Sequence, residues 1–215
     1  LLEEFEDVFS GKIQKPSSGM PVAHLIDTGD HMPVHQRPYK TSPKKKEEIR
    51  KHVSEMLFQG IIRPSKSPWS SPVVLVLKKD GKTRFCVDFR YLNRITKKDK
   101  YPLPLIDDLL DSLGKAKYFT TLDLASGYWQ IPIAEKDRKK TAFITPEGLF
   151  EFNVMPFGLT NAPSTFQRMM DSVLSGIKWR NTLFCLDDII IYSETAHEHL
   201  EHIREVLRRL KDAGL

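Results

Sequence analysis

The stretch Leu183-Phe-Cys-Leu-Asp-Asp-Ile-Ile-Ile-Tyr-Ser193 places two adjacent aspartates between two apolar runs. Each run has the length and composition of a buried β-strand. Because aspartate is poor in strands and favoured in turns, the stretch predicts a hairpin with Asp187 and Asp188 at its tip. Such a pair is commonly no more than a solvated turn. Here, however, apolar strands on both sides would hold the two carboxylates together, and Mg²⁺ would offset their repulsion.

A third carboxylate lies in the stretch Tyr118-Phe-Thr-Thr-Leu-Asp-Leu-Ala-Ser-Gly-Tyr-Trp-Gln-Ile-Pro-Ile133. Its first residues alternate as in a strand, which ends at Asp123 beside small residues that could turn backbone N–H groups toward a phosphate. Asp123 precedes Asp187 by 64 positions, so only folding can bring them together. Three aspartates could hold two metal ions, one activating a 3′-hydroxyl and one neutralising the leaving pyrophosphate.

The composition indicates an ordinary globular protein. The 215 residues are 40% hydrophobic and 28% charged, enough for one large domain or two lobes. No run of eighteen apolar residues occurs and the first residues are acidic, so we expect neither a membrane span nor a signal peptide. The two cysteines, Cys86 and Cys185, both fall in predicted strands, which favours a reduced, intracellular compartment.

The net charge of +5 is unevenly distributed. Between Lys78 and Lys100 there are nine Lys or Arg and three Asp, a local net charge of +6. A basic segment of this kind suits the phosphates of nucleic acid or of a triphosphate. A solubilising face is the alternative.

Local patterns predict the remaining elements. Ser42-Pro43 should open a helix that ends at Gly60, and Thr195-Ala-His-Glu198 is a capping box that should open another, ending at Gly214. His197, His199 and His202 on this last helix match no zinc motif, and we interpret them as a solvated polar face. The other expected elements are strands 73–77 and 84–89, helix 102–113, a helix or turn at 134–140, a hairpin at 141–153, a helix beginning at Asn161, and strands 182–186 and 189–193.

Several long motifs, in this order, resemble the reverse transcriptase of gypsy-type LTR retrotransposons. The resemblance runs from about Asp27 to the C-terminus. Its motifs are Gly60-Ile-Ile-Arg-Pro-Ser-Lys-Ser-Pro-Trp-Ser-Ser-Pro-Val-Val74, Arg84-Phe-Cys-Val-Asp-Phe-Arg-Tyr-Leu-Asn93, Leu122-Asp-Leu-Ala-Ser-Gly-Tyr-Trp-Gln-Ile131, Met155-Pro-Phe-Gly-Leu-Thr-Asn-Ala-Pro-Ser-Thr-Phe-Gln167 and Leu186-Asp-Asp-Ile-Ile-Ile-Tyr-Ser193.

The resemblance implies an α+β fold with the fingers and palm of a right-hand polymerase, an antiparallel palm sheet backed by helices, and no thumb. The implied division is an N-terminal extension at 1–40, fingers at 41–97 and 131–161, and palm at 98–130 and 162–215. It also implies RNA-directed DNA polymerase activity, with RNA or DNA template, DNA primer and deoxynucleoside triphosphates as partners, possible association with other parts of a Pol polyprotein, and a cytoplasmic location within retrotransposon particles.

The resemblance further implies roles for individual residues. Asp123, Asp187 and Asp188, with the backbone of Leu124, would hold two Mg²⁺ ions, for which Mn²⁺ can substitute. Tyr128 would lie under the sugar and exclude a 2′-hydroxyl. The other implied nucleotide contacts are Lys78 (or Lys79, depending on a one-residue gap), Arg84, Ala125, Ser126, Gly127 and Phe157, and the implied primer or template contacts are Cys185 and Leu186.

Two positions depart from the family pattern. Cys185 stands where the family normally has a tyrosine that touches primer or template. The absence of that tyrosine predicts lowered activity. Phe157 stands where retroviral relatives have a glutamine, and it can pack but cannot hydrogen-bond.

Two other functions stay open on the residues alone. A catalytically weak or inactive nucleic-acid-binding fragment would keep the basic segment without depending on the aspartates. A metal nuclease would also use carboxylates and Mg²⁺, but it gives no reason for the nucleotide-binding pattern of Lys78, Arg84 and Tyr128.

Overall fold

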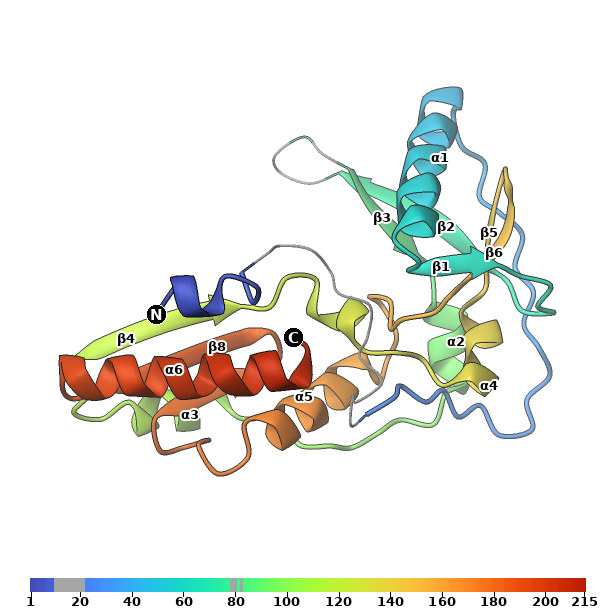
Figure 1. Cartoon of the computed structure of the whole chain (residues 1–215). Coiled ribbons are helices and arrows are strands. Elements are labelled where there is room, and N and C mark those ends of the chain that lie inside the picture. Colours follow the sequence, from blue (N-terminus) through green and yellow to red (C-terminus); the bar gives the residue numbers. More distant parts are fainter. Residues whose placement is uncertain (10–21, 78–80, 82) are drawn as a thin grey trace. The chain divides into compact units, whose positions relative to one another are not determined.

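The computed structural model describes residues 1–9, 22–77, 81 and 83–215. They form two compact units. Unit 1 comprises Leu1–Val22, Asp99–Gln130 and Pro163–Leu215, and unit 2 comprises Ala23–Lys98 and Ile131–Ala162. Each unit is therefore built from stretches that are far apart in the sequence (Figure 1).

Unit 1 is centred on an antiparallel sheet of three strands in the order β4-β8-β7. Its strands are β4 (Tyr118–Asp123), β7 (Thr182–Cys185) and β8 (Asp188–Ser193). Side chains alternate between the two faces of a strand, and register partners share a face. The pairing of Asp123 with Asp188 consequently fixes both aspartates on the same face of the sheet.

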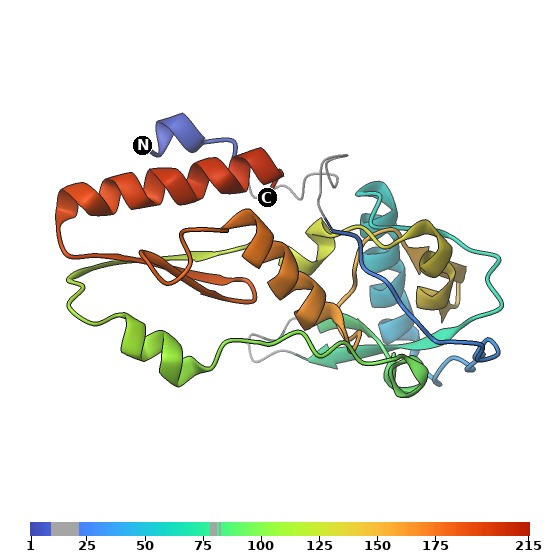
Figure 2. The same cartoon turned by 90° about the horizontal axis from the view of Figure 1, so that it is seen from below.

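Helices lie on the two faces of this sheet. Figure 2 shows α6 (Ala196–Ala213) along one face and α3 (Ile106–Ser112) on the other. Leu109 of α3 packs with Leu183 and Tyr192, which lie on the aspartate face. On the other face, the buried His199 of α6 is hydrogen-bonded to Thr120. Both faces of the sheet are therefore covered along part of their length.

Helix α5 (Ala162–Val173) supplies the most deeply buried side chains of unit 1. Phe166, Met169 and Met170 are fully buried, as expected for methionines on a core-facing stripe. Two short 3₁₀ helices complete the unit, η1 (Glu3–Phe5) and η2 (Gly127–Gln130).

Unit 2 contains a five-stranded sheet in the order β1-β6-β5-β2-β3. Its strands are β1 (Ile62–Pro64), β2 (Ser71–Leu77), β3 (Thr83–Val87), β5 (Phe143–Thr145) and β6 (Gly148–Phe152). The β2–β5 pair is parallel, and the other pairs are antiparallel. This parallel pair joins the two sequence-distant halves of the unit.

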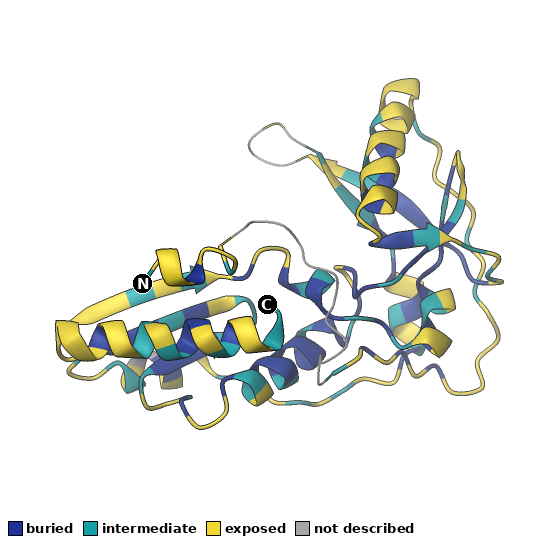
Figure 3. Ribbon diagram, viewed as in Figure 1, coloured by how far each residue is buried: buried dark blue, intermediate teal, exposed yellow. Residues whose placement is uncertain are grey.

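An aromatic cluster forms the core of unit 2. Phe143 is fully buried, and its ring centroid lies 5.6 Å from Phe85, 6.0 Å from Phe150 and 5.1 Å from Phe152. The helices of the unit are α1 (Pro43–Phe58), α2 (Arg90–Ile95), α4 (Glu135–Arg138) and the 3₁₀ helix η3 (Lys139–Thr141). Figure 3 shows α1 with one buried stripe and an exposed outer face.

The α+β class and most predicted elements are confirmed. Ser42 caps α1 and Thr195 caps α6, each by accepting a backbone N–H three residues on. The hairpins at 141–153 and 182–193 are present. No helix in the described part of the chain is both long enough and apolar enough to cross a membrane.

Three local predictions are wrong. The strand expected to end at Phe89 ends at Val87, because the Asp88 carboxylate accepts the Arg90 N–H and starts α2, which the sequence analysis missed. The helix expected from Pro102 begins only at Ile106, because a residue before proline disfavours helix and prolines follow both Tyr101 and Leu103.

The third concerns the histidines of α6, which do not form a uniformly solvated face. His197 is exposed, but His199 is only 8% exposed and both of its ring nitrogens are hydrogen-bonded. Ser193 and Thr120, on the sheet face that α6 covers, supply the partners. The polar partners on the strands are what allow a histidine to be buried there.

Candidate functional site

The hairpin has a turn of two residues that contains Asp187 but not Asp188, whereas the sequence predicted both aspartates at the tip. Strand β7 ends at Cys185 and β8 begins at Asp188, which pair with each other, so Leu186 and Asp187 form the turn. Leu186 has a φ of +59°, in the left-handed region. A positive φ at the first central residue alone is typical of a type II′ turn, where glycine is usual. Leucine in this conformation costs about 1–2 kcal/mol, so other contacts must stabilise the turn.

Asp123 lies directly opposite Asp188 across the β4–β8 pair. Directly opposed residues have Cβ atoms about 4.5–5.5 Å apart, near enough for two carboxylates to share a ligand. Asp123 and Asp188 are exposed, and Asp187 is half-buried. The sheet therefore sets the backbones of Asp123 and Asp188 opposite each other, with Asp187 in the adjoining turn, although these residues come from segments far apart in sequence.

The segment that follows Asp123 is a tight turn bonded to the hairpin. The Leu124 N–H donates to the Asp187 carbonyl oxygen (3.2 Å), and the Gly127 N–H donates to Leu124 (3.1 Å). Ser126 has a φ of +51°. Within the described residues, the N–H groups of Ala125 and Ser126 donate no hydrogen bond. Of the N–H groups expected to contact a phosphate, these two are the ones that remain available.

Gly127 is required by close packing. A Cβ atom on Gly127 would lie 2.8 Å from Cζ of Phe166 and 3.6 Å from Cβ of Asp187. Tyr128 packs on the same phenylalanine, with ring centroids 5.4 Å apart. Burial, followed by the negative charge of Asp187, raises the pKa of the Tyr128 hydroxyl. Tyr128 is therefore a neutral, half-buried ring close to the carboxylates.

Cys185 belongs to the same face of the sheet as the exposed aspartates. It pairs with Asp188 and packs against the cluster of Leu109, Leu183 and Tyr192. Burial raises the pKa of its thiol, and the charges of Asp188 and Asp187 raise it further. The side chain is thus a neutral, half-buried thiol at the rim of the site.

The donor chemistry of the three carboxylates fits a hard divalent cation such as Mg²⁺ or Mn²⁺. Among the described residues, however, no group of three or more Asp, Glu, His or Cys side chains is arranged to hold a metal ion. The backbone brings Asp123 opposite Asp188 and sets Asp187 next to it, while the side chains are not drawn together.

The remaining expected nucleotide contacts belong to unit 2 or lie outside the described residues. Lys78 and the alternative Lys79 lie in the part that is not described. Arg84 is exposed on β3, and Phe157 is 49% exposed. The loop after Phe157 is held by Asn93, which donates to the Gly158 carbonyl (2.7 Å) and accepts the Thr160 N–H (2.9 Å).

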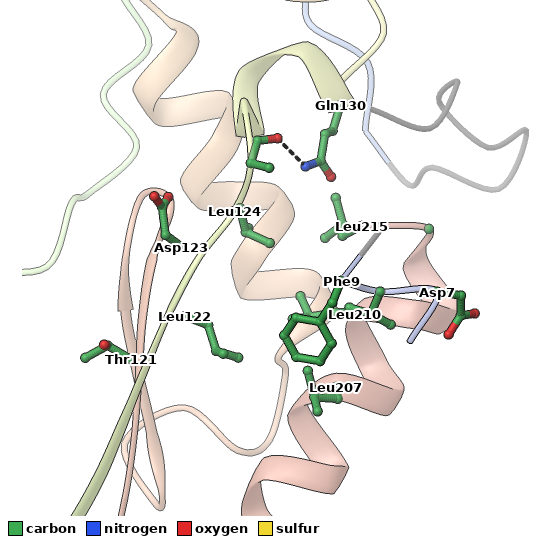
Figure 4. A pocket seen from close by; sticks show the side chains of 13 residues that line it. Asp7, Phe9, Thr121, Leu122, Asp123, Leu124, Gln130, Leu207, Leu210 and Leu215 are labelled. Atoms are coloured by element: carbon green, nitrogen blue, oxygen red, sulfur yellow. Dashed lines mark hydrogen bonds between the residues drawn. The ribbon is translucent and has the colours of Figure 1, made fainter. Parts of the chain in front are cut away.

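A cavity of about 300 Å³ lies beside the other face of β4. In Figure 4, Leu122 and Leu124 point toward it together with Phe9 and Leu215, whereas Thr121 and Asp123 point away. The Gln130 side chain at its edge donates to the Ala125 carbonyl (2.9 Å). Thr121 and Asp123 also line the cavity, although their side chains point away from it.

Sequence reasoning missed three residues that shape the site. Gln167 accepts the Leu186 N–H, Phe166 packs on Gly127, and Asn93 holds the loop after Phe157. All three lie inside the motifs of the resemblance. Nothing in the local pattern, however, indicates which distant backbone group each one contacts.

Comparisons with known proteins agree with this arrangement. A family model described as "Reverse transcriptase (RNA-dependent DNA polymerase)" matches residues 76–215. The Pol polyprotein from transposon 297 of Drosophila melanogaster is 41% identical over 220 residues, covering 100% of this chain and 21% of the polyprotein. The polyprotein from transposon gypsy of the same species is 45% identical over 200 residues, covering 90% of this chain and 19% of the polyprotein.

Solved structures are similar as well. The prototype foamy virus protease-reverse transcriptase (CSH mutant) has a TM-score of 0.85 and 27% identity, covering 99% of this chain and 28% of that one. A foamy viral protease-reverse transcriptase in complex with RNA/DNA hybrid has a TM-score of 0.87 and 26% identity, with the same coverage. The chain thus spans 19–21% of the length of these polyproteins and 28% of the length of these viral chains.

Proposed function

Because the chain belongs to the reverse transcriptase (RNA-dependent DNA polymerase) family, we propose that it adds deoxynucleotides to the 3′-hydroxyl of a primer on an RNA or DNA template. The observation that carries the proposal is the register of β4 and β8, which sets Asp123 opposite Asp188 beside the Asp187 turn. A foamy viral relative is in complex with RNA/DNA hybrid, which supports a nucleic-acid duplex as the partner.

In this proposal, unit 1 is the palm and unit 2 the fingers. The β4–β8–β7 sheet presents the carboxylates, as the antiparallel sheet of a palm would. The β2–β3 hairpin of unit 2 carries the exposed Arg84, whose guanidinium suits the triphosphate of the incoming nucleotide. Its positive charge is always present at physiological pH.

Asp123, Asp187 and Asp188 would hold two divalent cations, with the Leu124 carbonyl as a further oxygen ligand. That carbonyl accepts the Gly127 N–H and still has a second lone pair. When bound, such ions promote attack by the primer hydroxyl and neutralise the leaving pyrophosphate. The three carboxylates would determine where the positive charge of the ions is concentrated.

Two other features bind and orient the nucleotide. The N–H groups of Ala125 and Ser126, which donate to no acceptor among the described residues, would donate to phosphate oxygens, since consecutive backbone N–H groups in a turn form an anion-binding concavity. The Tyr128 ring, fixed against Phe166, would lie under the sugar and leave no room for a 2′-hydroxyl. Deoxynucleotides would then be selected because the 2′-hydroxyl of a ribonucleotide does not fit beside the ring.

The test is primer extension on a primed RNA template with Mg²⁺ and deoxynucleotides, comparing the parent chain with Asp187→Asn and Asp123→Asn. We expect extension to fall to background in both variants, because an amide keeps the shape of the carboxylate but loses its charge. Asp107→Asn is the matched control, because Asp107 is one of a second aspartate pair, exposed in the first turn of α3.

Each outcome separates the possible functions. Extension that survives Asp187→Asn would exclude the assigned site. No extension by the parent, with salt-sensitive duplex binding intact, would identify a non-catalytic nucleic-acid-binding fragment. Cleavage of the template by the parent without any extension would indicate a nuclease.

A further inference from the structure

The turn that carries Asp187 is supported from outside the hairpin. Leu186 is held in the left-handed region of φ, and its N–H cannot join the β7–β8 ladder because it lies at the turn. The Oε1 atom of Gln167 accepts this N–H at 3.1 Å. Gln167 lies on α5, 19 positions earlier in the chain.

The orientation of the Gln167 amide follows from this contact. Only the oxygen of the amide can accept a hydrogen bond from an N–H, so Nε2 must point the other way. Gln167 is fully buried, and its Nε2 atom has no hydrogen-bond partner among the described residues. A buried amide normally has both its oxygen and its nitrogen hydrogen-bonded. Because only the oxygen of Gln167 has a partner among the described residues, a hydrophobic side chain would suit this buried position better. The contribution of the glutamine is therefore its hydrogen bond with the Leu186 N–H.

The same turn of α5 also contacts the segment after Asp123. Phe166, adjacent to Gln167, packs so closely on Gly127 that no Cβ fits between them. Gly127 in turn lies against Asp187, whose carbonyl accepts the Leu124 N–H. Two adjacent residues of one helix therefore support both backbone segments that carry the aspartates.

We infer that Gln167 is a positioning residue for nucleotide addition, which holds the Leu186 turn so that Asp187 faces the position of Asp123 and Asp188. This inference rests on the proposed function. Gln167 is buried and acts through the Leu186 backbone, without touching substrate. Its loss lets the turn leave the left-handed conformation and moves the Asp187 carboxylate.

The first test replaces the amide without changing the length of the side chain. Gln167→Met removes the acceptor, and we expect kcat for nucleotide addition to fall by roughly 10- to 100-fold, because small displacements of catalytic groups have effects of this size. We expect KM for the deoxynucleotide to change little, because Ala125, Ser126 and Tyr128 keep their places. Ser164→Ala, a polar-to-apolar change at another buried position of the same helix, is the control and should retain the parent kcat.

A second variant gives a readout that a general loss of packing would not produce. In Gln167→Glu, an oxygen of the carboxyl group still accepts the Leu186 N–H in either protonation state. This variant should therefore keep the slow exchange of the Leu186 amide that Gln167→Met loses. Fast Leu186 exchange in Gln167→Glu would contradict the inference, as would an unchanged kcat in Gln167→Met.

Amide hydrogen exchange distinguishes failure of this inference from failure of the proposed function. If Gln167 holds the turn, the Leu186 N–H should exchange at least about tenfold faster in Gln167→Met than in the parent, while the Ile189 N–H in β8 should keep its rate. A parent without extension activity would disprove the proposed function, and the Leu186 amide would still report on the turn. Unchanged Leu186 exchange would overturn the inference even in an active enzyme.

Discussion

Cys185 lies on the aspartate face of the sheet, one strand away from Asp188. The neighbouring side chains Leu109, Leu183 and Tyr192 leave it half-exposed, so a larger side chain can extend outward from this position. Its thiol is neutral, because burial and the charges of Asp188 and Asp187 raise its pKa, and it is much shorter than an aromatic side chain.

Restoring a ring at this position should strengthen primer binding. We expect Cys185→Tyr to tighten primer–template binding by roughly fivefold or more and to raise the extension rate, because stacking on an aromatic ring contributes about 1–3 kcal/mol per base. Steady-state extension and a filter-binding titration measure the two effects. Cys185→Ser is the control, and equal behaviour of the tyrosine and serine variants would contradict the prediction.

Gly127 allows two backbone segments to approach within van der Waals distance of Phe166. We expect Gly127→Ala to destabilise the protein by about 1–3 kcal/mol, because the new Cβ would lie 2.8 Å from the Phe166 ring and must displace it. Thermal unfolding should show this as a fall of several degrees in melting temperature. Nucleotide addition should fall as well, since Tyr128 packs on the same ring.

The double variant Gly127→Ala, Phe166→Leu tests the cause. Removing the ring makes room for the methyl group, so the two changes should be less destabilising together than the sum of their separate effects. Additive effects would show that the contact between the two residues is not the reason for the glycine.

At the scale of secondary-structure elements, α6 is attached to the sheet by polar contacts as well as apolar ones. His199 bonds to Thr120 (2.8 Å) and Ser193 (3.0 Å), and Ser193 also bonds to His202 (2.7 Å). Burial, and then the nearby His202, lowers the pKa of His199. The neutral ring is therefore the form that the folded protein favours.

This preference predicts a pH dependence of stability. Because the folded-state pKa lies below the unfolded value of about 6.5, the unfolded chain binds more protons between the two values, and stability falls as pH drops through this window. The contribution of His199 is fully present above about pH 6.5. We expect His199→Gln to lower the melting temperature at pH 7.5 and to flatten the loss between pH 7 and pH 5.

His197→Gln is the matched control, because His197 is exposed on the same helix. Its unfolding curve should follow that of the parent at every pH. If the pH dependence of the melting temperature seen in the parent persists in His199→Gln, groups other than His199 cause it.

The strands and long helices were predictable from the sequence because their signals are local. Alternation predicted β4, an apolar run predicted β8, and Ser42 and Thr195 marked two helix starts. Helix α2 was missed although the contact at its start, from the Arg90 N–H to the Asp88 carboxylate, is also local, because a helix of six residues is too short to show a periodic apolar stripe. The partner of Gln167 was also hidden, since no periodic pattern connects a helix to a turn 19 positions away.

At the scale of the whole molecule, each unit needs stretches that are far apart in sequence. In unit 2, β1 pairs only with β6, and β2 reaches β5 through a parallel pair. Long-range pairing of this kind cannot be derived from local patterns. For this chain it was implied only by the resemblance to reverse transcriptases.

A fragment experiment tests the composition of unit 2. Residues 23–98 alone should be largely unfolded by circular dichroism, because they lack the partners of β1 and the fully buried Phe143. Residues 23–98 joined by a Gly/Ser linker to 131–162 should fold cooperatively. The Asn161 side chain, which donates to the Lys97 carbonyl (2.8 Å), ties the two stretches together near their ends.

A folded 23–98 fragment would show that the second stretch is dispensable. A joined protein without a cooperative transition would show that unit 2 depends on unit 1 for its stability.

The pairing of Asp123 with Asp188 also limits where codons can be inserted into genes for such proteins. Between these strands the chain leaves unit 1 after Gln130 and returns at Pro163. Codons inserted into that excursion leave the pairing of the strands unchanged, whatever their number. One codon inserted within β4 or β8 would turn an aspartate to the opposite face of the sheet. Inherited insertions should therefore accumulate in the loops of the excursion, outside β5 and β6, and be eliminated from β4 and β8.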